Sequence, residues 1–232
     1  MKSSEKRTDD QGRAYKGSQL QVQVYVNRRE RELSAAAGEA LGLAPEAITW
    51  VSPLEGRSFE EYRDMEFLEA VGQRAAAIDL AEFWPEQGPV WDALATVRTN
   101  NGPTGVILAE GKSYPAEMCG SGCQAGPKSR KTIEGSLRRT KSWLGVPDSS
   151  DWTGDYYQFA NRLAHLFFFR EVVGVPAWLV SLCFVDDPHK PTSLDEWQAG
   201  LLSAKTNMGI GSRPIPYYAD VFLPARSRSE LE

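Results

Sequence analysis

The chain has 232 residues, of which 41% are hydrophobic and 25% charged, and its formal net charge is −5 at pH 7. These values are ordinary for a globular protein long enough to bury one α/β core. The negative total argues against a protein that coats nucleic acid through bulk charge, although it leaves room for a local basic surface.

The ends of the chain and its cysteines suggest a location. No apolar run approaches the roughly eighteen residues of a membrane span, so we expect no membrane partner. The polar N-terminus lacks the apolar core of a secretory signal. Three cysteines are too few for a disulfide framework, which fits a reducing cytoplasm. Residues 1–18 are polar and predict a disordered tail, whereas residues 19–232 indicate a single α/β domain.

The first predicted elements are two strands with a helix between them. Residues 21–26 alternate with period two, which is typical of a strand. Residues 29–41 are rich in Ala and Glu and predict a short helix that ends near Gly42. Residues 48–51 predict a second strand, closed by the Ser-Pro pair that follows.

A longer helix is expected next. Ser58 and Glu61 have the spacing of a capping box, in which the two side chains cap the start of a helix. Apolar residues then recur every three or four positions as far as Ile78, so the pattern predicts an amphipathic helix that ends near Asp79. Two prolines and a glycine break regular structure in residues 83–89.

Residues 90–97 and 105–109 are apolar runs separated by turn-forming residues, which together predict a β-hairpin. If the turn is centred near residue 101 or 102, Asp92 lies across from Glu110 or Lys112. Glu110 and Lys112 share a face because side chains alternate along a strand. We therefore expect three ionisable side chains to meet at one end of the hairpin.

The rest of the chain alternates between helices and strands. Helices are predicted at residues 129–144, 155–170 and 195–205, and strands at residues 175–185 and 217–223. The fold class that follows is α/β, with a central mixed β-sheet flanked by helices.

The chemistry of the hairpin follows from the cost of burying charge. Asp92 and Glu110 would repel each other in an apolar setting, and the pKa of one would rise. A divalent cation removes that conflict, and Mg²⁺ favours a few carboxylates plus water. Lys112 could orient or deprotonate an attacking water, or neutralise charge on a phosphate. The alternative is a simple cross-strand pair of Asp92 and Lys112, with Glu110 solvated at the strand end.

Asp92 followed by Glu110-Gly111-Lys112 on the next strand resembles the D…E-x-K motif of the PD-(D/E)XK nuclease superfamily, which has the restriction-endonuclease-like fold. The resemblance covers roughly residues 55–185 and implies an α-β-β-β-α-β core. It also implies that Asp92 and Glu110 are metal ligands and that Lys112 is the catalytic lysine. An acid on the preceding helix often completes such a metal site, and Glu69 is the candidate, with Glu66 close behind.

Two features depart from the family pattern. Trp91, rather than a proline, directly precedes Asp92. The first core strand of the family is also not evident between Asp79 and Val90.

Further candidate residues lie on the two helices after the hairpin. Gln158 and Arg162 belong to a polar stripe with Asn161 and His165, and they either reach toward substrate phosphates or form a hydrated helix surface. Residues 112–141 carry seven basic and two acidic side chains. Within this segment, Lys128 and Lys131 either contact a nucleic-acid backbone or keep their helix soluble.

The sequence therefore predicts a Mg²⁺- or Mn²⁺-dependent phosphodiesterase, a nuclease that acts on DNA in preference to RNA. A rival hypothesis is a catalytically inactive nucleic-acid-binding or scaffold protein of the same fold, which the net negative charge favours. A homodimer stays open, since many nucleases that this chain resembles pair to cut both strands. We assign no zinc site, because Cys119 and Cys123 lack histidines at ligand spacing.

Overall fold

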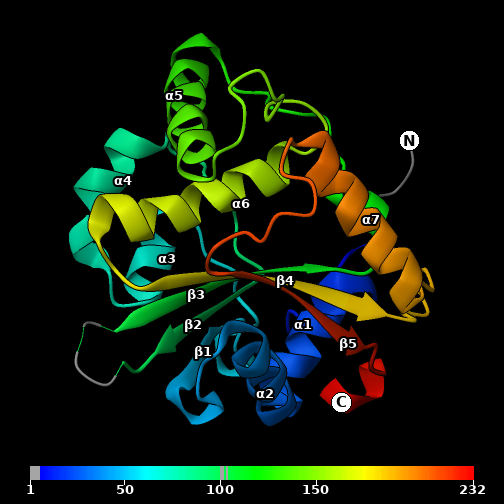
Figure 1. The fold of residues 1–232 in the computed structure, drawn as a ribbon. Coiled ribbons are helices and arrows are strands. Elements are labelled where there is room, and N and C mark those ends of the chain that lie inside the picture. The colour runs from blue at the N-terminus through cyan, green and yellow to red at the C-terminus, as the bar shows by residue number, and fades with distance from the viewer. Residues whose placement is uncertain (1–5, 100–101, 103) are drawn as a thin grey trace.

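A computed structural model describes residues 6–99, 102 and 104–232. A five-stranded sheet lies at its centre (Figure 1). The strands follow one another across the sheet in chain order: β1 (Ile48–Ser52), β2 (Ala93–Val97), β3 (Gly105–Lys112), β4 (Ala177–Val185) and β5 (Tyr218–Pro224). β2 is antiparallel to β1 and β3, whereas β3, β4 and β5 are parallel. The fold is α/β with a mixed sheet, as predicted.

Helices cover both faces of the sheet (Figure 1). On one face lie α1 (Gly17–Arg28) and α2 (Glu30–Leu41). The other face carries α3 (Asp64–Ala70), α4 (Ala77–Phe83), α5 (Pro127–Trp143), α6 (Tyr157–Phe167) and α7 (Leu194–Asn207). Among the residues described, no helix is both long and apolar enough to cross a membrane.

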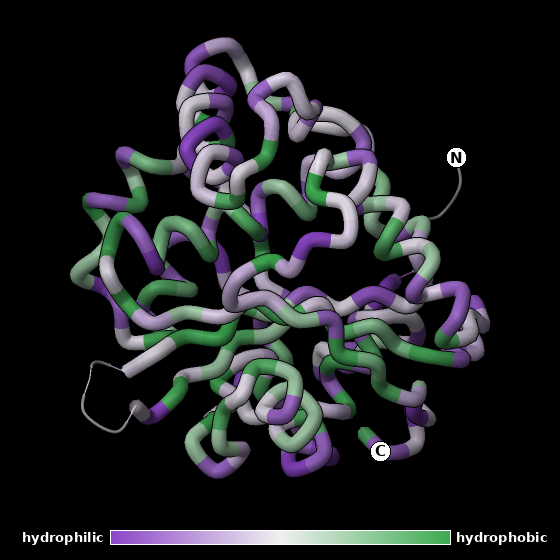
Figure 2. Tube along the Cα trace, viewed as in Figure 1, coloured by the Kyte–Doolittle hydropathy of each residue, from purple (hydrophilic) through white to green (hydrophobic). Residues whose placement is uncertain are grey.

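The core is divided into two layers by the alternation of side chains along the strands. Val106 and Leu108 of β3 pack toward α6, while Ile107 and Ala109 pack toward α1 and α2. The strands are accordingly mostly apolar, and much of α5 is hydrophilic (Figure 2). Because both faces of β3 are covered, a charged side chain near its end enters a poorly hydrated setting.

Most of the predicted elements are confirmed. β1, the hairpin of β2 and β3, and α2 lie where the sequence pattern places them. Every helix and strand predicted after residue 128 is also present, with ends that differ by a few residues. The predicted helix over residues 155–170 ends its α-helical part at Phe167 and continues as a π-helical turn, Phe168–Val173.

The predicted strand at residues 21–26 is wrong, because this segment lies inside α1. Its glutamines are buried as deeply as its valines, so the alternation does not mark one exposed face. The Gln21 side chain accepts a hydrogen bond from the Arg226 backbone N–H (2.6 Å) and donates to the Arg226 carbonyl (3.1 Å). Gln23 does the same with the N–H of Ala14 and the carbonyl of Gly12. These bonds satisfy the buried amides.

The long helix predicted from Ser58 is also wrong. Ser58 has φ 53° and ends a short 3₁₀ turn instead of starting a helix. Helix α3 begins only at Asp64, and the chain turns at Gly72 before α4. Glu61 is therefore not a helix-capping residue, and it lies between the 3₁₀ turn and α3.

Residues 6–18 differ from the disordered tail that we expected, whereas residues 1–5 lie outside the described residues. Thr8 forms a β-bridge with Ala14, and the side chain of Ala14 is buried against Leu20 and Leu231. Asp9 accepts a hydrogen bond from Arg228 at 2.8 Å. The segment is thus held between the first helix and the C-terminal residues.

Candidate functional site

The site is built at the end of β3. Ala93 lies opposite Ala109, so the next residues outward, Asp92 and Glu110, face each other across the hairpin. The carboxylate of Asp92 accepts a hydrogen bond from the backbone N–H of Gly111 at 2.8 Å. The structure thus brings together Asp92, Glu110 and Lys112, as the hairpin register predicts.

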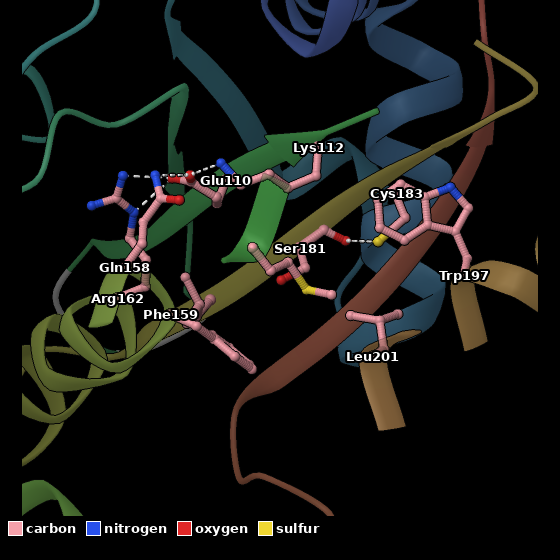
Figure 3. Close-up of a pocket in the computed structure, with 11 residues that line it drawn as sticks. Glu110, Lys112, Gln158, Phe159, Arg162, Ser181, Cys183, Trp197 and Leu201 are labelled. Atoms are coloured by element: carbon pink, nitrogen blue, oxygen red, sulfur yellow. Dashed lines mark hydrogen bonds and ion pairs between the residues drawn. The ribbon is translucent and has the colours of Figure 1, made fainter. Parts of the chain in front are cut away.

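Glu110 is a buried carboxylate with three donors. Its side chain is 8% exposed. Lys112 Nζ lies 2.5 Å and Gln158 Nε2 lies 2.8 Å from Oε1, and the Arg162 guanidinium lies 2.6 Å from Oε2 (Figure 3). Burial would raise the pKa of Glu110, but the charges of Arg162 and Lys112 outweigh it and hold the pKa below its ordinary value. Glu110 is therefore ionised at neutral pH.

Asp92 has the opposite character. Burial is the main cause that raises its pKa to about 8, and the negative charges of Glu110 and Glu61 add to the increase. Lys112 and Arg162 oppose this change without cancelling it. Asp92 consequently holds a proton at neutral pH, in contrast to the neighbouring Glu110.

Lys112 stays charged beside these two acids. Burial would lower its pKa, but the negative charges of Glu110 and Asp92 raise it above its ordinary value. In the cation-free protein, the Lys112 amine has no free electron pair at neutral pH, so it acts as a cation and not as a base.

The polar stripe of α6 faces the sheet. Arg162 and His165 are 5% and 1% exposed, so the hydrated-surface interpretation is wrong for them. Arg162 stacks over the Trp91 ring, with 4.7 Å between its Cζ atom and the ring centroid, and donates to the Val90 carbonyl at 2.8 Å. Trp91 thereby helps to position the guanidinium that binds Glu110. Contacts of Gln158 and Arg162 with phosphates stay a prediction.

A third carboxylate, Glu61, lies near this site and was not predicted to do so. The backbone N–H of Trp91 donates to the Tyr62 carbonyl at 2.9 Å in an isolated β-bridge, which brings Glu61 next to the segment that leads into β2. Burial raises the pKa of Glu61, the hydrogen bond from Gln19 (3.2 Å) lowers it, and the charge of Glu110 raises it further. No local pattern marks Glu61, because its neighbours come from α1 and β3.

The structure does not bring the other predicted residues to this site. Glu69 lies on α3, is ion-paired with Arg74 at 2.8 Å, and its side chain is 45% exposed. Glu66, the second choice, is exposed on the same helix. Lys128 and Lys131 are exposed near the start of α5. Lys128 lines a separate cleft between the end of α4 and α5.

A small cavity of about 20 Å³ lies next to Glu110 and Lys112, between α6 and α7 (Figure 3). Its other walls are largely apolar and include Phe159, Leu179 and Trp197. This volume accommodates about one water molecule. A large substrate therefore has to approach the acids from outside this cavity.

Comparisons with known proteins do not assign the chain to a family. A scan against protein-family models finds no match, and searches of curated proteins and of solved structures find none either.

The donor set suits a hard divalent cation that keeps some of its water. In the part of the chain that is described, no group of three or more His, Cys, Asp or Glu side chains is close enough to enclose a metal ion. Mg²⁺ is commonly held by only one or two carboxylates, and water or substrate phosphates complete its shell. Asp92 and Glu110 could supply such a pair, because burial and then the charge of Glu110 raise the pKa of Asp92, and a bound cation would favour its ionised form.

Proposed function

We propose that this protein is a Mg²⁺- or Mn²⁺-dependent nuclease that hydrolyses phosphodiester bonds, in DNA rather than RNA. The observation that carries the proposal is the juxtaposition of Asp92, Glu110 and Lys112, with a proton held on Asp92 beside an ionised Glu110. Strongly perturbed carboxylates with a specific charge partner are typical of functional sites.

The order of the elements supports the resemblance to the PD-(D/E)XK superfamily. Helices α1 and α2 precede β1, and then β2, β3, α5, α6 and β4 follow in the implied α-β-β-β-α-β order. β1 takes the place of the first core strand, which is not evident in residues 79–90 because α3 and α4 are inserted between β1 and β2. The resemblance then begins at α1 instead of near residue 55.

In this proposal Asp92 and Glu110 would hold the cation, and the charge of Glu61, which already acts on Asp92, would add to the attraction. The bound cation would polarise the scissile phosphate and favour hydroxide at neutral pH. Arg162 and Gln158 orient the Glu110 carboxylate through their hydrogen bonds. In the cation-free protein Lys112 is protonated, which favours a role in neutralising charge that develops on the phosphate over a role in proton abstraction.

A second candidate is a nucleic-acid-binding or scaffold protein that retains this fold without turnover. The observation in its favour is that Lys112, Gln158 and Arg162 already occupy both oxygens of Glu110. A cation would have to compete with these donors. Cleavage activity separates the two candidates.

The test is incubation of the purified protein with Mn²⁺ and four substrates: plasmid, linear duplex, single-stranded DNA and RNA. We expect cleavage that EDTA abolishes and that falls by about 100-fold or more in Asp92→Asn and Lys112→Ala. The exposed Glu134, which pairs with Arg130, provides a matched control, and Glu134→Gln should cleave like the wild type. Absence of cleavage, or cleavage that is unchanged by Lys112→Ala, would overturn the catalytic proposal.

A further inference from the structure

A second, larger cleft of about 820 Å³ opens where the N-terminal segment meets the loop after β4. Lys6, Arg7 and Lys16 line it from the segment before α1, and Gln19 lines it from the first turn of that helix. His189 lines it from the loop that follows β4. Its size is within the range of natural ligand pockets.

Two hydrogen bonds connect residues that line this cleft with residues of the carboxylate site. The Gln19 side chain donates to Glu61 at 3.2 Å, and burial raises the pKa of Glu61 while the charge of Arg7 lowers it. Ser113, which directly follows Lys112, donates its N–H to the Glu117 carboxylate at 2.7 Å, and Glu117 lines the cleft. A ligand in the cleft therefore lies beside the end of β3.

The charge of the cleft favours an anion. Lys6, Arg7 and Lys16 are exposed, and Glu117 is the one acidic residue among the described residues that line the cleft. Lys6 pairs with Asp10 at 3.3 Å, but both side chains are more than three-quarters exposed, so the pair holds the lysine weakly. Since the whole chain is acidic, this local excess of positive charge is not a consequence of composition.

An aromatic side chain stands among these cations. Tyr15 is 46% exposed and also lines the cleft. Its ring is supported by Arg228, whose Cζ atom lies 5.1 Å from the ring centroid. An exposed aromatic ring beside basic side chains is the arrangement that stacks unpaired bases while cations follow the phosphates. Bases inside a duplex cannot stack in this way.

We propose that this cleft binds a single-stranded segment of nucleic acid and leads it to Asp92 and Glu110. The choice of nucleic acid as the ligand rests on the proposed nuclease function. Lys6, Arg7 and Lys16 contact the phosphodiester backbone, and Tyr15 stacks on a base.

The test is equilibrium binding of a labelled oligonucleotide of about 12 nucleotides to the full chain in EDTA, so that cleavage does not interfere. The variant Lys6→Ala/Arg7→Ala/Lys16→Ala is compared with a control that removes three exposed arginines elsewhere, Arg31→Ala/Arg74→Ala/Arg98→Ala. Both lose the same charge, so a difference between them reports position and not net charge.

We expect the cleft variant to bind about tenfold more weakly or worse, and its slope of log K against log salt to fall by about 2, as the loss of three phosphate contacts requires. The control should stay within about twofold of the wild type, because distant charges are screened. Tyr15→Ala should lose about fivefold or more, and Tyr15→Phe should retain the affinity.

Equal affinity of the two triple variants would overturn the inference, as would tighter binding of duplex than of single strand, or equal competition by an acidic peptide. Circular dichroism melting of each variant excludes unfolding as the cause. Because binding is measured without a cation, it is independent of turnover. If the protein binds the single strand but does not cleave it, only the nuclease proposal is refuted. If the protein cleaves DNA but the cleft variant binds the strand as well as the wild type, only the assignment of the cleft as the binding site is refuted.

Discussion

The substitution Asp92→Asn should stabilise the protein in the absence of divalent cations. The pKa of Asp92 is about 8 in the folded protein, compared with an ordinary value of 3.8. The unfolded chain therefore releases the Asp92 proton at a lower pH than the folded protein does. Since the folded state binds more protons over this range, Asp92 lowers the free energy of unfolding as the pH rises from about 4 to about 8. Asparagine has no proton to lose and removes this penalty.

The size of the effect follows from the shift. One pKa unit corresponds to about 1.36 kcal/mol, so the interval between 3.8 and pH 7 sets an upper limit of about 4 kcal/mol. Asp92 is only partly buried as a residue, and screening by solvent reduces the expected gain to about 2 kcal/mol. The gain should vanish near pH 4, where the carboxyl is protonated in both states.

The assay is urea denaturation of wild type and Asp92→Asn in EDTA at pH 5 and pH 8, with equal m values as the condition for comparison. The exposed Asp79 on α4 gives a matched control, and Asp79→Asn should change stability little at either pH. Mn²⁺ should raise the stability of the wild type and leave that of Asp92→Asn unchanged. A variant that is less stable than the wild type at pH 8, or a gain that is equal at both pH values, would refute this reasoning.

Three further predictions concern the same site. The affinity of the wild type for Mn²⁺ should rise about tenfold per pH unit from pH 6 to 8, with release of about one proton, because Asp92 must ionise to bind the cation. Calorimetry in buffers of different ionisation enthalpy measures the affinity and the number of protons released. An affinity that does not change with pH would contradict this prediction. Glu61→Gln should weaken Mn²⁺ binding by about tenfold, whereas Glu69→Gln should not change it. The same calorimetric titration measures both affinities, and equal affinities of the two variants would contradict this prediction. Arg162→Ala should cost about 3–5 kcal/mol of stability, since it leaves Glu110 buried without its guanidinium partner; a loss below about 1 kcal/mol in denaturation would show that Lys112 suffices.

The hairpin and its three ionisable residues were predictable because their signal is short in range. A run of turn formers between two apolar runs sets the register, and the register alone places Asp92 opposite Glu110. The helices and strands after residue 128 were predictable for a similar reason, since their apolar periodicity reports one buried face. None of these inferences needs knowledge of a distant segment.

The first eighty residues were less predictable because distant partners decide their structure. Gln21 and Gln23 are buried in α1, and their side chains bond to backbone groups of other segments, one of them two hundred residues away. Glu61 has the sequence spacing of a capping residue, yet it lies next to Gln19 of α1 and to the segment that leads into β2. Local propensity cannot anticipate a partner that only the tertiary fold supplies.

The contacts of α6 explain how a buried, ionised Glu110 is stabilised without a cation. Arg162 and Lys112 supply positive charge to Glu110, which lets a buried carboxylate stay ionised. The same two cations fail to bring the pKa of Asp92 back to its ordinary value, because burial and Glu110 act more strongly on it. The hairpin therefore holds one acid whose charge is compensated and one whose charge is not, and in the proposed nuclease the uncompensated Asp92 would exchange its proton for a metal ion. Under this proposal the cation affinity, its pH dependence and the stability of the fold all depend on one free energy, the cost of ionising Asp92 beside Glu110.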